Sequence, residues 1–256
     1  MKLINKDLRL KIVKMITNAN EGHIPSSLSI VDIINFLYQK KLKQSFNKKD
    51  KDYFILSKGH GCAALYVVLN KFKLLTNEEL KKYGKAGSIL GGHPDSTKIR
   101  NVEASTGSLG HGFPTATGIA LGLKIKKKKQ KVYCLIGDGE CHEGSIWESA
   151  SICANLKLDN IICILDWNKS AQQLMKIENL EKKWKSFGWK TVIANGHSNK
   201  SLDQSFKKIN KNDGVPKIVI CNTIKGKGIS FMQGHGVWHH KIPNSQEFEE
   251  IKKELK

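Results

Sequence analysis

The sequence predicts a three-layer αβα fold, in which helices cover both faces of a doubly wound, mainly parallel sheet. Short runs of residues are apolar at nearly every position, which is typical of strands that are buried on both faces. These runs alternate along the chain with segments of helical periodicity, and glycine-rich turns join them. A length of 256 residues with 39% hydrophobic residues is sufficient for one large core, so we expect a single domain over residues 1–256.

The strands are expected where β-branched and apolar residues cluster, at residues 53–57, 132–137, 161–165, 190–194 and 217–221. Helical spacing of apolar residues predicts helices at residues 8–16, 29–37, 62–69, 116–123, 143–158 and 178–187. Residues 236–256 are expected to form a C-terminal loop and an amphipathic helix over 245–256, with acidic residues early and basic residues late, as the helix dipole favours.

The net charge of +20 raises the question of a nucleic-acid or membrane-surface partner. Only Arg9 and Arg100 among the 43 basic residues are arginine, whereas specific phosphate and base recognition depends largely on the planar guanidinium. The lysines are spread along the chain, and the one dense run, Lys126 to Lys129, indicates a solvated loop. We therefore expect no nucleic-acid partner.

The six cysteines form no Cys-x-x-Cys pair, and several lie in apolar runs, so we expect buried or free thiols. The first seven residues lack the apolar core of a signal peptide. No apolar stretch approaches the ~18 residues of a membrane span. The sequence therefore predicts a cytoplasmic protein without a membrane partner.

Three glycine-rich turns follow or precede predicted elements, at residues 57–61, 106–112 and 137–139. In a doubly wound sheet, ligands bind beyond the carboxyl ends of the strands, where glycines let backbone N–H groups and helix N-termini approach an anionic phosphate. The turns together indicate a phosphorylated ligand.

Asp138 and Asn168 follow consecutive predicted strands that a single helix connects. If these strands are adjacent and parallel, the carboxylate and the amide oxygen meet at one edge of the sheet, where they could form part of an all-oxygen Mg²⁺ site. Structural roles are an equally open interpretation on spacing alone, because Asp138 could cap a helix and Asn168 could form a turn.

The residues themselves are more specific than their spacing. Residues 137–148 (Gly-Asp-Gly-Glu-Cys-His-Glu-Gly-Ser-Ile-Trp-Glu) and residues 165–168 (Leu-Asp-Trp-Asn) resemble the thiamine diphosphate motif, which runs from Gly-Asp-Gly to a later asparagine. The chain is similar to the transketolase family in this segment and in five further strings, which occur in family order at residues 21–29, 56–61, 91–94, 103–110 and 223–228. The resemblance implies the thiamine-diphosphate-binding fold and, within it, the half that holds the diphosphate.

The resemblance also implies roles for individual residues. Asp138, Asn168 and the carbonyl group of Ser170 match the ligands of Mg²⁺ or Ca²⁺. Gly139 and His60 match contacts to the cofactor diphosphate.

The loop formed by Gly107, Ser108 and Leu109 matches the segment that approaches the aminopyrimidine. Glu143 matches a buried glutamate that meets its counterpart across a subunit interface, and is expected to act in catalysis and cofactor binding. His23 and His239 match active-site histidines placed near the thiazolium ring and the substrate hydroxyls, and His60 is expected to be catalytic as well.

Some residues depart from the family pattern. Trp167 and Lys169 flank the asparagine where aspartate-rich strings are usual, a variant that resembles split transketolases. An Asn-Gly-His-Ser string leaves the role of His197 open. His235, His239 and His240 crowd one stretch, and His239 is chosen because Trp238 precedes it.

In the transketolase family, the glutamate that activates the cofactor comes from a second domain, and no equivalent segment is recognised in this sequence. We therefore expect the partner to be a separate pyrimidine-binding subunit, in an α₂β₂ heterotetramer. The expected activity is transfer of a two-carbon ketol unit from a ketose, usually phosphorylated, to an aldose. The sugars themselves are not predicted.

Other functions remain open at this point. A deoxyxylulose-phosphate synthase and the α-subunit of a 2-oxo acid dehydrogenase share the Gly-Asp-Gly and asparagine pattern. A non-catalytic scaffold that has kept the fold is the alternative from another class. The strings at residues 57–60 and 225–228 fit transketolase better than its enzymatic rivals.

Overall fold

The five apolar runs predicted as strands pair into one parallel sheet with the order β1-β2-β3-β5-β4. The structure is a computed structural model that describes residues 3–43, 51–234 and 236–256. The strands span Tyr53–Leu56 (β1), Val132–Gly137 (β2), Ile161–Trp167 (β3), Lys190–Asn195 (β4) and Lys217–Asn222 (β5). The predicted parallel sheet is confirmed, including the adjacency of β2 and β3, in which Gly137 is in register with Asp166.

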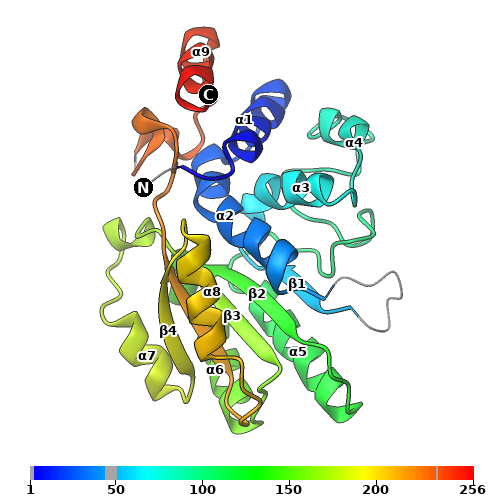
Figure 1. Cartoon of the computed structure of the whole chain (residues 1–256), viewed down its shortest axis with the longest axis vertical. Helices are drawn as coiled ribbons and strands as arrows, with labels where there is room; N and C mark the ends of the chain where they lie inside the picture. Colours follow the sequence, from blue (N-terminus) through cyan, green and yellow to red (C-terminus); the bar gives the residue numbers. More distant parts are fainter. Residues whose placement is uncertain (1–2, 44–50, 235) are drawn as a thin grey trace.

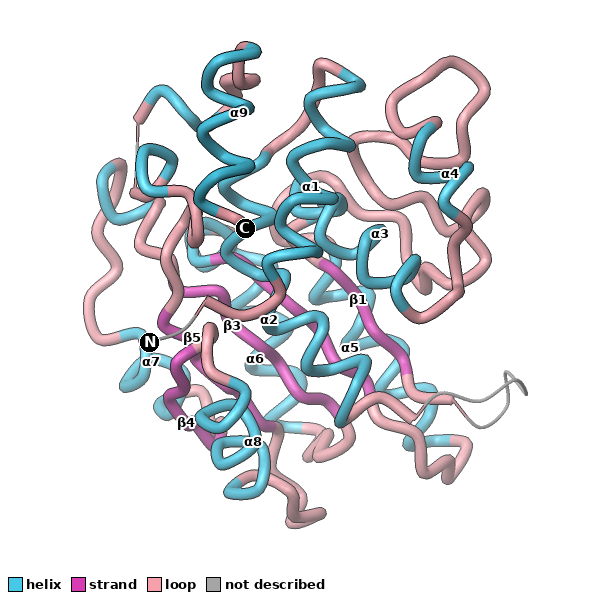
Figure 2. Tube along the Cα trace, turned by 45° about the horizontal axis from the view of Figure 1, so that its top comes forward, coloured by secondary structure: helices cyan, strands magenta, loops and turns pink. Residues whose placement is uncertain are grey.

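Helices flank this sheet (Figures 1 and 2). They span Lys6–Ala19 (α1), Ile24–Lys40 (α2), Cys62–Lys71 (α3), Asn77–Lys81 (α4), Gly112–Ile125 (α5), Gly144–Asn155 (α6), Leu180–Ser186 (α7), Asn199–Lys208 (α8) and Ser245–Glu254 (α9). Short 3₁₀ turns lie at Gly59–Gly61 (η1), Asp138–His142 (η2), Ala171–Gln173 (η3), Ser230–Met232 (η4) and Val237–His239 (η5). None of the described helices is long and apolar enough to cross a membrane.

Alternate residues of the strands enter two separate cores, one on each face of the sheet. Leu135 and Ile164 pack with α1, α2, α3 and α8, whereas Cys134 and Cys163 pack with α5, α6 and α7. The three-layer αβα prediction is therefore confirmed. All six cysteines are buried free thiols, as expected.

The structure corrects several boundaries. The second helix begins at Ile24 rather than at residue 29, because Pro25 fits the first turn of a helix and the small residues that follow are buried against the core. Helices α4 and α8 were not predicted. Strand β4 is not apolar on both faces: Ile193 is 47% exposed because β4 forms an edge of the sheet.

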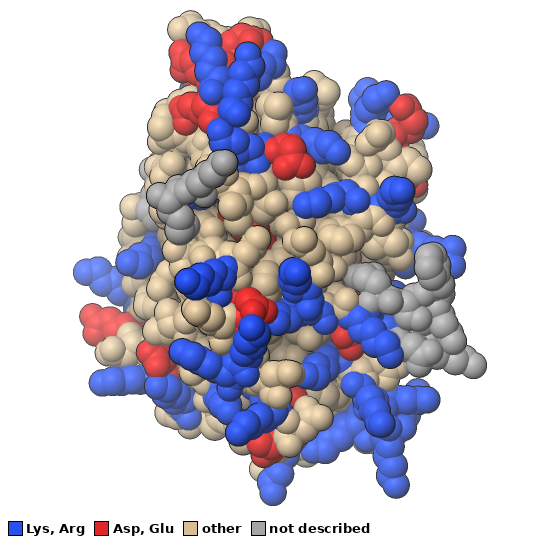
Figure 3. Space-filling model, viewed as in Figure 1, with Lys and Arg blue, Asp and Glu red and all other residues tan. Residues whose placement is uncertain are grey.

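The basic side chains do not form one continuous patch on the face seen in Figure 3, where acidic side chains lie among them. Lys126 to Lys129 follow the end of α5 and are exposed, as a solvated loop would be. The predicted solvated loop at these four lysines is therefore confirmed.

Asp166, near the end of β3, is fully buried and receives four hydrogen-bond donors from different parts of the chain. Its Oδ2 accepts hydrogen bonds from Lys58 Nζ at 2.5 Å and from Ser29 Oγ and Asn168 Nδ2, each at 2.8 Å. Its Oδ1 accepts from Thr223 Oγ1. The carboxylate therefore joins the start of α2, the turn after β1 and the end of β5 at the carboxyl edge of the sheet.

A second buried network anchors α2. The Asp32 carboxylate accepts hydrogen bonds from Arg9 NH2 at 2.5 Å and from His197 Nδ1 at 2.8 Å. Because His197 Nε2 accepts from the backbone N–H of Ile224 at 2.9 Å, the ring proton lies on Nδ1 and is donated to Asp32. The contacts of His197 are thus structural.

Position 112 requires glycine because the backbone of Ser57 lies too close to leave room for a side chain. A Cβ there would lie 2.5 Å from the Cα of Ser57, whereas a Cβ at Gly118 on the same helix meets nothing within 4 Å. We expect Gly112→Ala to lower the free energy of unfolding by about 1–3 kcal/mol through overpacking. Gly118→Ala, the matched control, should raise it by about 0.5–1 kcal/mol because alanine favours the helix. Urea denaturation measures both, and an equal response of the two variants would contradict this account.

Asp166→Asn should lower the free energy of unfolding by about 3–5 kcal/mol at neutral pH, because it leaves the buried Lys58 ammonium without its counter-charge. Asp203→Asn, which removes a partially exposed partner of Lys41, is the control and should change stability little.

The effect of Asp166→Asn should depend on pH. Burial opposes ionisation of Asp166, but the Lys58 charge and the donors around it hold the pKa of this carboxyl below its usual range. The ionised Asp166 carboxylate therefore adds its full stabilisation to the folded state above the pKa of an ordinary aspartate. This stabilisation is lost as pH falls through the lowered pKa of Asp166. Urea denaturation at decreasing pH should show that the free energies of unfolding of the parent chain and of Asp166→Asn become more similar. If their difference stays constant down to acidic pH, the ion pair is not the cause of the destabilisation.

Candidate functional site

A cavity of about 330 Å³ opens at the carboxyl edge of the sheet. It brings together seven of the residues predicted for the site: His60, Leu109, Asp138, Gly139, Asn168, Ser170 and His239. Gly107, Ser108, His23 and Glu143 do not line it. A second cavity, of about 380 Å³, lies at the amino ends of the strands and is lined mainly by lysines, but it contains none of the predicted residues.

Asp138 begins the turn η2 directly after β2, and 5% of its surface is exposed. Its Oδ1 accepts a hydrogen bond from the N–H of Gly139 at 2.9 Å and its Oδ2 accepts one from the N–H of Ala171 at 3.4 Å. Among the described residues, no ion pair involves this carboxylate. Burial and the nearby Asp166 charge raise its pKa. A cation beside Asp138 would relieve both effects.

The orientation of Asn168 follows from its neighbour Asp166. An ionised carboxylate only accepts hydrogen bonds, so the nitrogen of the Asn168 amide must face Asp166. The amide oxygen then points the other way, where it accepts a hydrogen bond from the N–H of Ser170 at 2.9 Å. Asp138 and Asn168 thus present oxygens at the ends of adjacent strands, a donor set that fits Mg²⁺.

The turn η1 and the loop before α5 are in close contact. A Cβ on Gly59 would lie 2.7 Å from the carbonyl oxygen of Thr106. Leu109 of this loop lines the cavity, Ser108 is exposed, and Gly107 packs against the ring of His93. The absence of a side chain at Gly59 therefore lets the loop approach His60 and the cavity.

Histidines gather at one side of the cavity. The ring centroid of His23 lies 5.2 Å from that of His60 and 5.3 Å from that of His239. Burial and the Lys58 charge lower the pKa of His60 to about 2, and burial together with His240 and His239 lowers that of His23 to about 4. Both rings are therefore neutral at physiological pH, when each can donate one hydrogen bond and accept another.

Glu143 differs from the expectation of a buried glutamate, because it is exposed on the surface of this chain. The buried carboxylate of the segment is Glu140, which accepts hydrogen bonds from the N–H groups of Gly110 at 3.0 Å and Gly137 at 2.8 Å. Glu140 holds the turn η2 against the loop before α5. Burial of Glu143 would require contact with another chain.

Three site residues were missed by sequence analysis: Lys58, Asp166 and Lys225. Lys225 Nζ donates to Ser170 Oγ and contacts His239 Nδ1, both at 2.9 Å. The three residues lie inside sequence motifs that resemble the transketolase family, at residues 56–61, 165–168 and 223–228. Their pairing could not be predicted, because it depends on how the fold brings these motifs together.

His235 lies outside the described residues. His240 stacks against His23, with ring centroids 3.9 Å apart.

Comparison with known proteins agrees with this geometry. Residues 1–256 match the family model described as transketolase, thiamine diphosphate binding domain. The chain is 40% identical to an apulose-4-phosphate transketolase subunit of Actinobacillus succinogenes, with 98% of this chain and 94% of the relative covered. It is 35% identical to a 6-deoxy-6-sulfo-D-fructose transketolase subunit of Clostridium sp., with 86% and 82% covered.

The fold is also similar to solved structures. A transketolase variant from Pichia stipitis superimposes with a TM-score of 0.90 at 27% identity, over 98% of this chain and 40% of that chain. The chain thus spans about two fifths of that enzyme and most of the length of the relatives named as subunits. It belongs to the transketolase family, in which it corresponds to the thiamine diphosphate-binding domain and to the first subunit of split transketolases.

Proposed function

We propose that the chain binds thiamine diphosphate with Mg²⁺ in the cavity at the carboxyl edge of the sheet. Together with a separate pyrimidine-binding subunit, it transfers a two-carbon ketol unit from a ketose to an aldose. The observation that carries the proposal is the buried Asp138 carboxylate, which has no ion-pair partner among the described residues and lines the same cavity as Asn168.

Asp138, Asn168 and the Ser170 carbonyl group would hold the cation, and Ca²⁺ would fit the same oxygens. His60 would donate a hydrogen bond from its neutral ring to the diphosphate, next to the backbone of Gly139. The loop of Gly107, Ser108 and Leu109 would approach the aminopyrimidine. Leu109, which already lines the cavity, supports this placement.

The bound cofactor supplies carbanion-stabilising chemistry that the side chains of the protein lack. His23 and His239 are neutral donors and acceptors at the same side of the cavity, and they would orient substrate hydroxyls or move a proton there. Lys225 contacts His239 and Ser170, and thereby fixes the position of the imidazole.

The relatives are named for different sugars, apulose 4-phosphate in one case and 6-deoxy-6-sulfo-D-fructose in another. Both names describe sugars with an anionic group. We therefore propose sugar phosphates or similar acidic sugars as substrates, without assigning one.

The surface around the cavity supports a partner subunit. Leu174 is 93% exposed although it lines the cavity, and Val237, which is close in sequence to His239, is 77% exposed. Exposed apolar side chains of this kind are typical of interaction surfaces. Glu143, exposed here, would become buried in the same assembly, for which we propose an α₂β₂ heterotetramer in the cytoplasm.

Asp138→Asn should weaken Mg²⁺-dependent binding of thiamine diphosphate by at least about tenfold, because a neutral amide replaces the anionic ligand. Glu140→Gln is the control: its carboxylate also lines the cavity, but it accepts hydrogen bonds from Ser57 Oγ and from the N–H groups of Gly110 and Gly137. The substitution should therefore reduce stability and leave the Mg²⁺ dependence unchanged. Calorimetric titration of the two-subunit complex at several Mg²⁺ concentrations measures both. Unchanged cofactor affinity in Asp138→Asn would refute the assignment.

The purified chain alone should show no ketol transfer, and activity should appear when the partner subunit is added. The physical reason is that the cofactor lies between two domains, and the activating glutamate is expected from the other one. The assay supplies thiamine diphosphate, Mg²⁺ and donor and acceptor sugar phosphates, and follows the product. Robust turnover by the 256-residue chain alone would show that the activating group is already present in it.

A further inference from the structure

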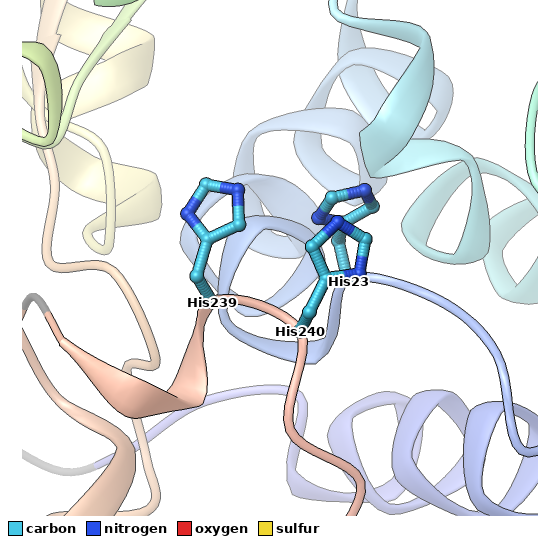
Figure 4. Close-up of side chains that lie close together, drawn as sticks. All are labelled: His23, His239 and His240. Atoms are coloured by element: carbon cyan, nitrogen blue, oxygen red, sulfur yellow. The ribbon is translucent and has the colours of Figure 1, made fainter.

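Three histidine side chains meet beside the cavity in an arrangement that the proposed function does not require. His23 precedes the first residue of α2, and His239 and His240 lie at the end of η5. One ring nitrogen from each lies within 4.8 Å of those of the other two. In Figure 4 the rings of His23 and His240 lie against each other, and the ring of His239 stands beside them.

The nitrogen atoms of this cluster are available as ligands. His23 Nδ1 is buried and has no hydrogen-bond partner, a state that is unfavourable for a polar atom removed from water. Burial and the neighbouring histidines lower the pKa of His23 to about 4, and burial with the Lys225 charge lowers that of His239. The two rings are therefore uncharged at neutral pH and can offer a lone pair.

We propose that His23, His239 and His240 bind a first-row transition-metal ion, with Zn²⁺ as the representative, at a site distinct from the Mg²⁺ site. Imidazole nitrogen is a ligand that Zn²⁺, Ni²⁺ and Cu²⁺ prefer, whereas Mg²⁺ requires oxygen. The two positions are therefore selective for different ions. Three imidazoles also leave one coordination position open, as in catalytic zinc sites.

The geometry needs a small adjustment to close around an ion. Tetrahedral Zn²⁺ with bonds of about 2.0–2.1 Å places its ligand atoms roughly 3.4 Å apart, which is closer than the 4.8 Å limit of this cluster. His239 and His240 are exposed and follow Gly234 and Gly236, whose φ angles of 94° and 127° are accessible mainly to glycine. We expect rotation of these two exposed side chains, with the backbone freedom of the glycines, to bring the nitrogens to the ion.

The proton of His239 must be accounted for. Its Nδ1 contacts Lys225 Nζ, so Nε2 is the nitrogen that can bind the ion. In the ion-free chain Nδ1 accepts from the Lys225 ammonium, so the proton of the neutral ring lies on Nε2. Binding of the ion through Nε2 releases this proton to solvent, and Nδ1 takes up one proton from solvent. Lys225 then keeps its hydrogen bond to Ser170 Oγ and gives up its contact with the ring.

A bound ion would join residues 236–240 to the start of α2 at the side of the cavity. His23 and His239 are the residues that we propose to contact substrate, so the ion would compete with the sugar. This consequence rests on the proposed function, whereas binding of the ion does not.

Binding is tested by calorimetric titration of the full chain with Zn²⁺ in excess Mg²⁺, which occupies the oxygen site. We expect one equivalent to bind, and His240→Asn to weaken binding by at least about tenfold. The control is His111→Asn at an exposed histidine outside the cluster, which should leave the affinity unchanged. All six cysteines are buried, so thiols do not compete in the folded chain. Absence of binding, or equal binding by His240→Asn and the parent chain, would overturn the proposal.

Thermal unfolding with and without Zn²⁺ gives a second measure, because an ion that binds only the folded chain raises its melting temperature. The increase should disappear in His240→Asn and persist in His111→Asn. In the complex with the partner subunit, Zn²⁺ should inhibit ketol transfer. In His240→Asn, the rate with Zn²⁺ should be closer to the rate of the same variant without Zn²⁺. A complex without ketol transfer would count against the proposed function, and a complex that is active but insensitive to Zn²⁺ would count against competition with substrate.

Discussion

The ion pair between Lys58 and Asp166 is the contact on which the arrangement of the site depends. Both side chains are almost fully removed from water, with side-chain exposures of 2% and 0%. An isolated buried charge is very unfavourable, so neither group can be in place without the other. Lys58 follows β1 and Asp166 lies in β3, and β2 lies between these two strands. The ion pair therefore fixes the positions of the carboxyl ends of three neighbouring strands relative to one another. The cavity forms at these ends.

The same carboxylate determines which way the Asn168 amide points: its nitrogen faces Asp166, and its oxygen accepts from the N–H of Ser170. Asn168 and Asp138 both line the cavity. The Lys58 ammonium has a further effect, because its charge favours the neutral form of the nearby His60. One buried pair thus organises an oxygen-rich side and an imidazole-rich side of a single cavity. The two sides can bind different chemical groups: the oxygen-rich side can bind cations and the phosphates that accompany them, and the imidazole-rich side can bind hydroxyl groups.

The strands and the edge of the sheet that carries the site were predictable from sequence, because they follow from apolar runs and from the position of glycine turns. Three features were not predictable from sequence: the start of α2, the exposure of β4 and the existence of α8. They depend on which strand lies at the edge of the sheet and on which face each helix covers. Residues of the proposed oxygen site were selected from motifs, whereas the pairing of Lys58 with Asp166 joins residues that are distant in sequence. Glu143 is exposed on this chain, so the buried position implied by the family resemblance is not found within it. The single-domain prediction and the assigned catalytic roles remain predictions.

The positions of the charged and neutral groups support the proposed cation and the proposed second chain. Asp138 is a buried carboxylate without an ion pair among the described residues, and burial and the nearby Asp166 charge raise its pKa. Lys225 lines the same cavity, where burial and the Lys58 charge lower its pKa. A divalent cation bound to an anionic diphosphate would supply a positive charge next to Asp138 and negative charges within reach of the lysines. Two exposed apolar side chains are unfavourable in water: Leu174, which lines the cavity, and Val237, which lies two residues before His239 in the sequence. A partner that covers them would also exclude water from the cavity, which strengthens every electrostatic contact inside it.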